Sequence, residues 1–219
     1  SRHLGDRELY QVDGDEVAFY KQMVLDVPLQ ELMEKASQKR TDHWGEVITY
    51  SRKVFVPLTN MCRDTCSYCT FVKHPDNPKA KIMSPQEVLT AALEGEKQGC
   101  KELLFSLGEK PERRYAKPRK ALEALGYKTM TGYLSDMCKL VIANTSLLPH
   151  LNTGTLSEYE FMQLKNVSAS MGMMLETTSK RVPTKGGPPY ACPDKVPIQR
   201  IRTLITAGYC KGPFTTGIL

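Results

Sequence analysis

One continuous stretch joins an apolar segment to three closely spaced cysteines: Val54-Phe55-Val56-Pro57-Leu58-Thr59-Asn60-Met61-Cys62-Arg63-Asp64-Thr65-Cys66-Ser67-Tyr68-Cys69. Residues 47–58 are rich in β-branched and aromatic side chains, which favours a strand. The uninterrupted apolar core of this segment is typical of a strand that is buried on both faces. The sequence therefore predicts a buried strand whose carboxyl end leads into a cysteine-bearing loop.

The segments downstream alternate between strand-like and helix-like patterns. We predict strands over residues 103–107, 146–149, 168–175 and 214–219, and helices over residues 85–98, 111–125, 131–144, 157–164 and 197–207. Ser84 with Glu87, and Ser157 with Glu160, have the spacing of a capping box at two of the helix starts. Pro149 indicates a strand end or a sheet edge.

Alternation of this kind calls for parallel strands joined by right-handed helical crossovers, and so for an α/β barrel or part of one. A doubly wound sheet is the alternative. No Gly-x-Gly-x-x-Gly pattern follows the first strand, as it would in a dinucleotide-binding fold, and this favours the barrel.

The chain is expected to have two parts. Residues 1–45 contain two helix-like stretches, 15–25 and 29–39, and we predict an N-terminal helical extension. Residues 46–219 would form the barrel core. The final strand has no helix behind it, which leaves an apolar face uncovered. We therefore expect the core to be C-terminally incomplete, truncated at the fifth strand.

Composition limits the classes of protein that the chain can represent. Of its 219 residues 25% are charged and 41% are hydrophobic, which is typical of a globular protein. No apolar run approaches the roughly 18 residues of a membrane span, and the N-terminus lacks the apolar core of a signal peptide. The net charge is 30 − 24 = +6, which by itself supports no nucleic-acid binding. Seven cysteines, an odd number, favour a reducing, cytoplasmic compartment.

The loop cysteines Cys62, Cys66 and Cys69 could together hold one small inorganic centre. Three thiolates suit a 4Fe–4S cluster that has one iron without a protein ligand, whereas an electron-transfer cluster normally takes four cysteines. S-adenosylmethionine (SAM) could chelate the vacant iron through its amino and carboxylate groups. The reduced cluster could then cleave the sulfonium of SAM to a carbon radical.

Zinc is the competing interpretation, because His74 would complete a Cys3His site in a binding module without enzymatic activity. Parallel barrels carry their active sites at the carboxyl ends of the strands, where the three cysteines are predicted to lie. This position favours the iron–sulfur cluster over a structural zinc site. The remaining cysteines are scattered singly and are best explained as small buried hydrophobic residues: Cys100, Cys138, Cys192 and Cys210.

Polar residues recur at the ends of the other predicted strands. They are Gly108 and Glu109 after the second, His150 and Asn152 after the third, Glu176 after the fourth, and Thr215 and Thr216 on the fifth. Gly108 would let backbone approach a ligand, and Glu109 could hold an ammonium group. Glu176 could accept hydrogen bonds from ribose hydroxyls. His150 could take or give a proton.

The cysteine pattern Cys-x-x-x-Cys-x-x-Cys, with an aromatic residue before the last cysteine, resembles that of radical SAM enzymes. Further motifs resemble the FO synthase family within that group, in its cyclising subunit or the N-terminal half of the fused enzyme, where FO is 7,8-didemethyl-8-hydroxy-5-deazariboflavin. The resemblance covers about residues 46–219, and its motifs are 49–55 (TYSRKVF), 69–71 (CTF), 106–112 (SLGEKPE), 147–150 (LLPH), 170–177 (SMGMMLET) and 213–217 (PFTTG).

This resemblance implies a partial (β/α) barrel of the radical SAM type and a role in 5-deazaflavin biosynthesis. A tyrosine-derived ribitylaminouracil adduct would lose hydrogen to a 5′-deoxyadenosyl radical and then close its ring with loss of ammonia, a lyase-type cyclisation. The resemblance assigns Cys62, Cys66 and Cys69 to the 4Fe–4S cluster, and Tyr68, Gly108, Glu109 and Glu176 to SAM. Tyr68 would lie against the adenine, Glu109 would bind the methionine amino group, and Glu176 would face the ribose. Substrate contacts would come from His150, Asn152, Thr215 and Thr216.

The sequence also departs from the family pattern. Asn152-Thr153-Gly154 stands where the family has Asn-Pro-Gly, and Pro189 stands where a histidine is expected. The family continues past residue 219 through a glycine-rich segment and a sixth strand. An inactive fragment of the enzyme is therefore an alternative to an active one. The expected partners are a companion radical SAM subunit or domain that attaches tyrosine, and a reductant such as ferredoxin or flavodoxin.

Overall fold

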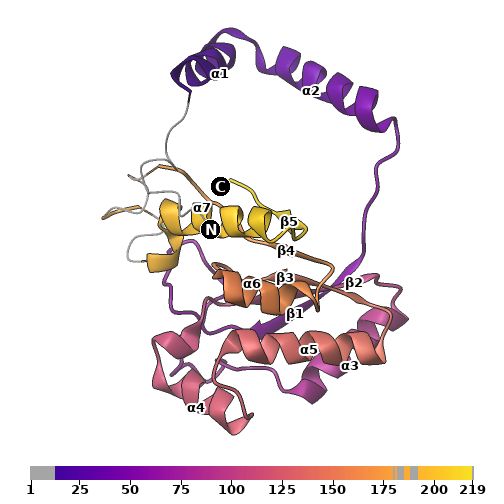
Figure 1. The fold of residues 1–219 in the computed structure, drawn as a ribbon, viewed down its shortest axis with the longest axis vertical. Coiled ribbons are helices and arrows are strands. Elements are labelled where there is room, and N and C mark those ends of the chain that lie inside the picture. Colours follow the sequence, from indigo (N-terminus) through magenta and orange to yellow (C-terminus); the bar gives the residue numbers. More distant parts are fainter. Residues whose placement is uncertain (1–12, 180, 182–184, 188–191, 219) are drawn as a thin grey trace. The chain divides into compact units, whose positions relative to one another are not determined.

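The computed structural model describes residues 13–179, 181, 185–187 and 192–218. The chain divides into two compact units, Ser1–Tyr50 and Ser51–Leu219. The described part of the first unit contains the helices α1 (Gly14–Asp26) and α2 (Leu29–Trp44), drawn in indigo and purple in Figure 1. Both helices include the predicted helical stretches. The second helix ends at Trp44, beyond the predicted end at residue 39, and the next residue, Gly45, has a φ of +69°, which suits a helix end.

The second unit alternates strands and helices, as the sequence predicts. Its strands are β1 (Lys53–Thr59), β2 (Glu102–Leu107), β3 (Leu148–Asn152), β4 (Ser170–Gly172) and β5 (Phe214–Thr215). Its α-helices are α3 (Pro85–Lys97), α4 (Ala116–Ala124), α5 (Met130–Asn144), α6 (Glu158–Lys165) and α7 (Pro197–Tyr209), with 3-10 turns η2 (Pro111–Arg113) and η3 (Pro193–Lys195). Both predicted capping boxes are present, at the starts of α3 and α6.

The five strands form one parallel sheet in the order β1-β2-β3-β4-β5. Sequential order confirms the predicted partial parallel barrel. It excludes a doubly wound sheet, in which the strand order reverses at a switch point. Because all strands are parallel, their carboxyl ends lie along one edge, and the cysteine loop leaves the sheet at that edge (Figure 1).

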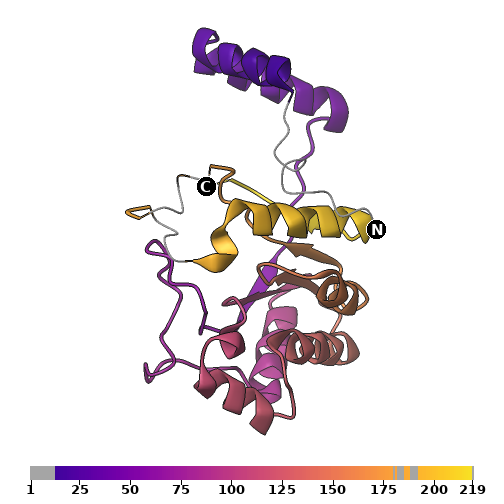
Figure 2. The same cartoon turned by 60° about the vertical axis from the view of Figure 1, so that its left-hand side comes forward.

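The hydrophobic core lies between one face of the sheet and the helices that cover it, which Figure 2 shows from the side. Side chains alternate along each strand, so every second residue joins the core. The strand residues in the core are Val56, Leu58, Leu103, Phe105, Leu151 and Met171, and they meet Val88, Ala92, Tyr133, Leu134, Phe161 and Leu164 from α3, α5 and α6.

The other face of the sheet is more open, and this corrects the prediction that the first strand is buried on both faces. Phe55 is 53% exposed, because it points away from the face that the helices cover. Its ring makes an edge-to-face contact with Phe71 of the cysteine loop. The strand is also shorter than predicted, since it begins at Lys53.

Pro149 does not mark a sheet edge, because β3 pairs with β2 on one side and with β4 on the other. It lies near the start of β3, which agrees with the alternative prediction of a strand end. Pairing with β4 begins one residue later, at His150 and Ser170, so the missing N–H of Pro149 has no strand partner opposite it.

Two further helices differ from the sequence pattern. The predicted helix over 111–125 is divided into η2 and α4, with Tyr115 in an extended conformation between them. The helix that was expected to end at residue 207 includes Gly208 and Tyr209. The left-handed conformation after this helix falls on Lys211, at φ +50°, whose N–H donates to the carbonyl of Gly208.

The scattered cysteines behave largely as predicted. Cys138 and Cys192 are buried, whereas Cys100 and Cys210 are half-buried and pack against the core. Among the helices of the described residues none combines the length and the apolar character that a membrane crossing requires.

We expect opposite effects from alanine at two helical glycines. A Cβ at Gly95 of α3 would lie 2.6 Å from Val54 Cβ, whereas a Cβ at Gly208 of α7 would have no neighbour within 4 Å. Alanine improves helix propensity by about 1 kcal/mol at either site, but overpacking costs about 1–3 kcal/mol. In urea denaturation Gly95→Ala should therefore lower the free energy of unfolding, and Gly208→Ala should raise it. A Gly95→Ala variant that is as stable as Gly208→Ala would contradict this packing.

Candidate cofactor site

The cysteine loop is a folded element with its own backbone contacts. Met83 N donates to Leu58 O at 2.9 Å, and Lys73 N donates to Asn60 O at 2.8 Å, so both ends of the loop return to the end of β1. The Asn60 side chain bridges the loop, because its amide donates to Lys79 O at 2.8 Å. These contacts hold the three cysteines at the carboxyl edge of the sheet.

The thiols of Cys62 and Cys66 lie in partly buried positions. Cys62 Sγ accepts hydrogen bonds from Glu109 N at 3.1 Å and Asp64 N at 3.4 Å. Burial raises the pKa of the Cys62 thiol to about 11, although both N–H groups oppose this shift. Burial, followed by a hydrogen bond with Cys192, raises the pKa of Cys66 to about 12. A bound metal centre would instead favour the thiolate forms of these cysteines, since a coordinating thiol loses its proton.

The donor set fits an iron–sulfur cluster, because N–H groups that point at thiolate sulfur stabilise and tune such centres. The site is not closed around a metal in this conformation. Within the described residues no three Cys, His, Asp or Glu side chains lie close enough to hold one ion. The half-buried Cys69 and the other two thiols would therefore have to come together as the cluster binds.

His74, the fourth ligand of the zinc interpretation, is engaged elsewhere. Its Nδ1 lies 3.4 Å from Asp76 Oδ2, and its ring meets that of Tyr115 at a centroid distance of 5.3 Å. The side chain is 60% exposed. These contacts direct the imidazole toward α4 and give the Cys3His arrangement no support.

Gly108 brings the end of β2 against the cysteine loop. A Cβ at this position would lie 2.0 Å from Met61 O and 2.7 Å from Cys62 Cβ, so a side chain is sterically excluded. Gly108 N donates to Thr59 O at 3.1 Å, and Arg63 N donates to Glu109 O at 2.9 Å. The sequence predicts a close approach here. The structure shows that the backbone of the cysteine loop is what lies close to Gly108. A contact between Gly108 and a cofactor stays a prediction.

Glu109 is buried, and its carboxylate is already hydrogen-bonded. Thr155 donates to it through N at 3.1 Å and through Oγ1 at 2.8 Å. Gly154, at φ +77°, lies so close that a Cβ would be 1.7 Å from Glu109 Oε2. Burial, followed by the charge of Asp194, raises the pKa of Glu109 to about 7. Glu109 therefore lies at the edge of the site, and its pKa is close to neutral pH.

Glu176 and Tyr68 form a second group at the same edge. Glu176 is buried at φ +70°, an uncommon conformation for a residue with a side chain, and it pairs with Lys195. The Lys195 ammonium lies 5.7 Å from the centroid of the Tyr68 ring. Burial, and then the charges of Glu176 and Cys66, raise the pKa of Tyr68. Lys195 thus brings Glu176 close to Tyr68 of the cysteine loop, and the adenine and ribose contacts stay predictions.

His150 and Asn152 lie within β3 and not after it, because the strand continues to Asn152. The β-register places Asn152, Gly172 and Thr215 side by side on the open face of the sheet. His150 Nδ1 contacts Ser170 Oγ, and its Nε2 would be 3.6 Å from a Cβ at Gly172. Burial, followed by the charge of a nearby lysine, lowers the pKa of His150.

Thr216 differs from the other candidate substrate residues. Its Oγ1 donates to Met173 O at 2.8 Å and accepts from Leu175 N at 3.1 Å, so the hydroxyl joins the segments that follow β4 and β5. A Cβ at Gly172 would lie only 2.7 Å from Thr215 Oγ1. The Thr215 hydroxyl therefore fits here because residue 172 is a glycine. The structure therefore brings together His150, Asn152 and Thr215, and it leaves Thr216 outside that group.

Sequence reasoning missed the charged residues that join distant parts of the site. Arg63 binds Asp194 through two hydrogen bonds, and Lys195 binds Glu176. The first pair is separated by 131 positions, so no spacing rule relates its members. The Gly-Gly-Pro-Pro segment before Asp194 is a recognisable turn signal, but it falls partly outside the described residues. The position of Pro189 also lies outside them.

The profile of the Radical SAM superfamily matches residues 56–184. The FO synthase of Mycobacterium leprae (strain TN) is 50% identical over 177 residues, which are 78% of this chain and 20% of that protein. The 7,8-didemethyl-8-hydroxy-5-deazariboflavin synthase of Methanopyrus kandleri is 42% identical over 173 residues, covering 79% of this chain and 52% of that protein. The chain thus spans between a fifth and about half of the length of these relatives.

Solved structures share the fold at low sequence identity. The FeFe-hydrogenase maturase HydG from Carboxydothermus hydrogenoformans matches with a TM-score of 0.66 and 18% identity, over 86% of this chain and 40% of its own. Methylornithine synthase (PylB) matches with a TM-score of 0.64 and 14% identity, over 99% of this chain and 56% of its own. The solved structures confirm the fold, and the family profile and the sequence relatives confirm the resemblance that the motifs indicated.

The raised pKa of Glu109 predicts how stability depends on pH in the chain without a cluster. The folded state holds this proton up to about pH 7, whereas the ordinary pKa is 4.5. Folding then favours the protonated form, so the free energy of unfolding falls as pH rises between these values. Asp64, with its pKa raised to about 6 by burial, contributes in the same direction. Glu109→Gln should weaken the decline, measured by urea denaturation at about pH 5 and about pH 7.5.

The matched control is Glu123→Gln, which removes an exposed carboxylate from the end of α4. This variant should retain the full decline in stability. If Glu109→Gln and Glu123→Gln show the same pH dependence as the unmodified chain, Glu109 does not have the environment described above.

Proposed function

This chain belongs to the radical SAM superfamily, and from that membership we propose that it is part of an FO synthase, acting in 5-deazaflavin biosynthesis. The observation that carries the proposal is the 50% identity to an FO synthase over a region that includes the cysteine loop. The position of that loop at the carboxyl edge of a sequential parallel sheet supports the same conclusion, because parallel barrels place their chemistry there.

Cys62, Cys66 and Cys69 would hold a 4Fe–4S cluster. When bound and reduced together with SAM, this cluster supplies a 5′-deoxyadenosyl radical that would take a hydrogen atom from a tyrosine-derived ribitylaminouracil adduct. The chain's own contribution is to fix the loop. The N–H of Glu109 and the N–H of Asp64 point at Cys62 Sγ, and they would stabilise the thiolate form.

Glu109 and Glu176 would both bind SAM. An ammonium group beside Glu109 would favour its ionised form and offset the effect of burial on its pKa. Glu176 is held by Lys195 next to Tyr68, which suits a carboxylate that accepts hydrogen bonds from ribose hydroxyls while the phenol ring lies against adenine. Gly108 would contribute indirectly, since it lets the end of β2 reach the loop.

The substrate would lie on the open face of the sheet, against His150, Asn152 and Thr215. Ser170 orients the His150 ring through Nδ1, which leaves Nε2 directed toward Gly172. Loss of ammonia and ring closure both require proton movement, and a half-buried imidazole is suited to that task. Thr216 would act through the backbone, by holding β5 in register with the end of β4.

The proposed organisation has residues 46–219 as the catalytic core and residues 1–45 as a helical extension. A companion radical SAM domain or subunit would attach tyrosine, consistent with the greater length of the FO synthase relatives. A low-potential reductant would supply electrons. The oxygen-sensitive cluster and the odd number of cysteines suit the reducing cytoplasm.

Cluster loading tests the metal assignment directly. After anaerobic reconstitution with iron and sulfide and reduction with dithionite, the chain should give the electron paramagnetic resonance signal of a reduced 4Fe–4S cluster. Alanine at Cys62, Cys66 or Cys69 should abolish the signal, because each removes one of three ligands. The control is Cys100→Ala, which changes a half-buried cysteine two residues before β2. Tightly bound zinc that is lost in His74→Ala would instead support the zinc module.

Product formation tests the reaction. We expect the reconstituted full-length protein, supplied with SAM, dithionite and the tyrosine-derived adduct, to release 5′-deoxyadenosine and form FO, measured by chromatography with mass detection. His150→Asn should lower product formation by about 10²-fold or more if the imidazole moves a proton. Release of 5′-deoxyadenosine with no FO from the unmodified enzyme would refute the assigned substrate but not the radical chemistry.

A further inference from the structure

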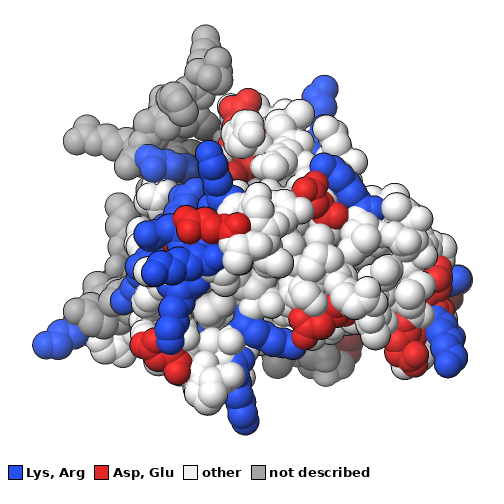
Figure 3. All heavy atoms as spheres, turned by 90° about the horizontal axis from the view of Figure 1, so that it is seen from below, with Lys and Arg blue, Asp and Glu red and all other residues white. Residues whose placement is uncertain are grey.

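A basic surface lies beside the cysteine loop. In residues 76–80 and 111–124 the exposed acidic side chains are Asp76 and Glu123. The exposed basic side chains in the same segments, named here the α4 basic patch, are Lys79, Arg113, Arg114, Lys117, Arg119 and Lys120. These segments therefore expose six basic side chains and two acidic ones, whereas the whole chain has 30 basic and 24 acidic residues. The local excess of positive charge is strong. Figure 3 shows basic side chains gathered on this side of the molecule.

The patch is fixed to the loop that carries the cysteines. Arg114 Nη1 donates to the carbonyl of Arg63, the residue that follows Cys62. Lys117 Nζ lies 2.6 Å from Asp76 Oδ1, which ties α4 to the turn at the far end of the loop. One hydrogen bond and one residue therefore separate the guanidinium of Arg114 from the backbone of Cys62. A protein bound to this patch would lie next to the cluster ligands.

We propose that the α4 basic patch is the docking surface for an acidic one-electron donor protein, a small iron–sulfur or flavin protein. This inference rests on the proposed function, because the cluster must be reduced before SAM can be cleaved. One electron passes from the reduced donor to the cluster, and no bond forms or breaks. A patch of one sign steers a partner of the opposite sign and raises its association rate by about 10–10³-fold, an effect that salt weakens.

The chemistry of the patch favours an acidic protein over a nucleic acid. Single-stranded nucleic acids are bound where aromatic rings are interleaved with basic groups and can stack on the bases. In the described residues of these segments the aromatic side chain is Tyr115, and its ring already meets His74 edge-to-face and the Arg114 guanidinium at 5.2 Å from its centroid. The surface thus offers charge without a stacking platform.

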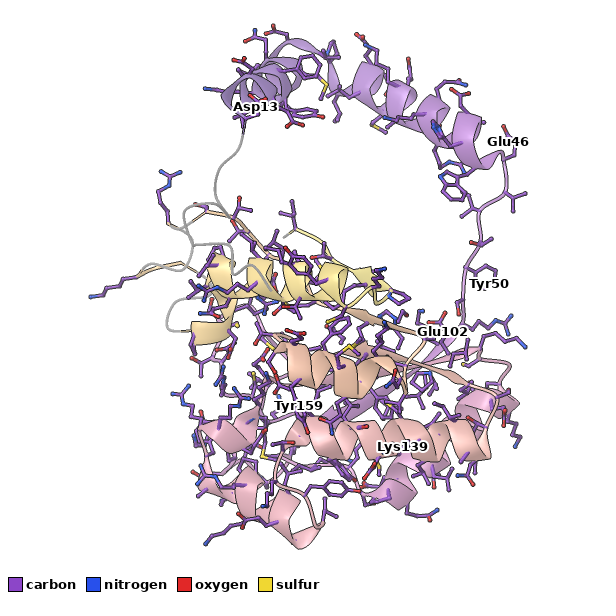
Figure 4. The ribbon with its side chains drawn as sticks, viewed as in Figure 1. Asp13, Glu46, Tyr50, Glu102, Lys139 and Tyr159 are labelled. Atoms are coloured by element: carbon purple, nitrogen blue, oxygen red, sulfur yellow. The ribbon has the colours of Figure 1, made fainter. Side chains whose placement is uncertain are left out.

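The test measures electron transfer into the reconstituted cluster by stopped-flow absorbance, with a reduced plant-type 2Fe–2S ferredoxin as donor. Lys117→Glu with Lys120→Glu reverses two charges of the patch. The matched control, Lys97→Glu with Lys101→Glu, lies at the other end of the sheet, next to Glu102, which Figure 4 labels at the start of β2. Both pairs change the net charge from +6 to +2, so they differ only in position.

At about 0.01 M ionic strength the patch variant should transfer electrons at least about tenfold more slowly than the unmodified chain, and the control less than about twofold more slowly. Salt at about 0.15 M, where the Debye length falls from about 30 Å to about 8 Å, should remove most of the difference. Reduction by dithionite should be equal in all three proteins. Equal ferredoxin rates in the two variants would overturn the proposal, as would a single-stranded oligonucleotide that binds the patch while ferredoxin rates stay unchanged. Absence of any cluster signal would refute the proposed function instead.

Discussion

The close contact between the end of β2 and the cysteine loop is the constraint on which the site depends. Gly108 allows the backbone to approach Met61 and Cys62 at distances that no side chain would permit. From this approach follow two hydrogen bonds, from Glu109 N to Cys62 Sγ and from Arg63 N to Glu109 O. The first cysteine and the buried carboxylate are thus positioned by one shared contact. Displacement of either would move the other.

The two faces of the sheet differ: helices cover one face, and the other is more open. Side chains alternate along the strands, and the helices cover one face. The other face carries polar residues in neighbouring register positions, including Asn152 and Thr215. A parallel sheet with sequential strand order gathers the carboxyl ends of its strands at one edge, so the cysteine loop and this polar face adjoin each other.

Buried and half-buried ion pairs connect the segment around η3 to the rest of the site. Arg63 with Asp194, and Glu176 with Lys195, join residues that are far apart in the sequence. Such pairs contribute little to stability, since the cost of desolvation offsets their attraction. Their effect is geometric. They join the segment around η3 to the cysteine loop and to Glu176, and Thr155 Oγ1 contacts both Asp194 and Glu109.

The sequence by itself determined the order of strands and helices, both capping boxes, the parallel α/β class and the position of the three cysteines after the first strand, because these features depend on local spacing and periodicity. It did not determine that Phe55 is exposed, that Pro149 lies in an interior strand, or that Gly208 continues a helix, since each depends on which neighbours surround the residue. The partnerships of Arg63 with Asp194 and of Glu109 with Thr155 were likewise decided by the tertiary structure. Hydrogen bonds and burial act through space, and residues that meet across a sheet edge leave no regular interval in the chain.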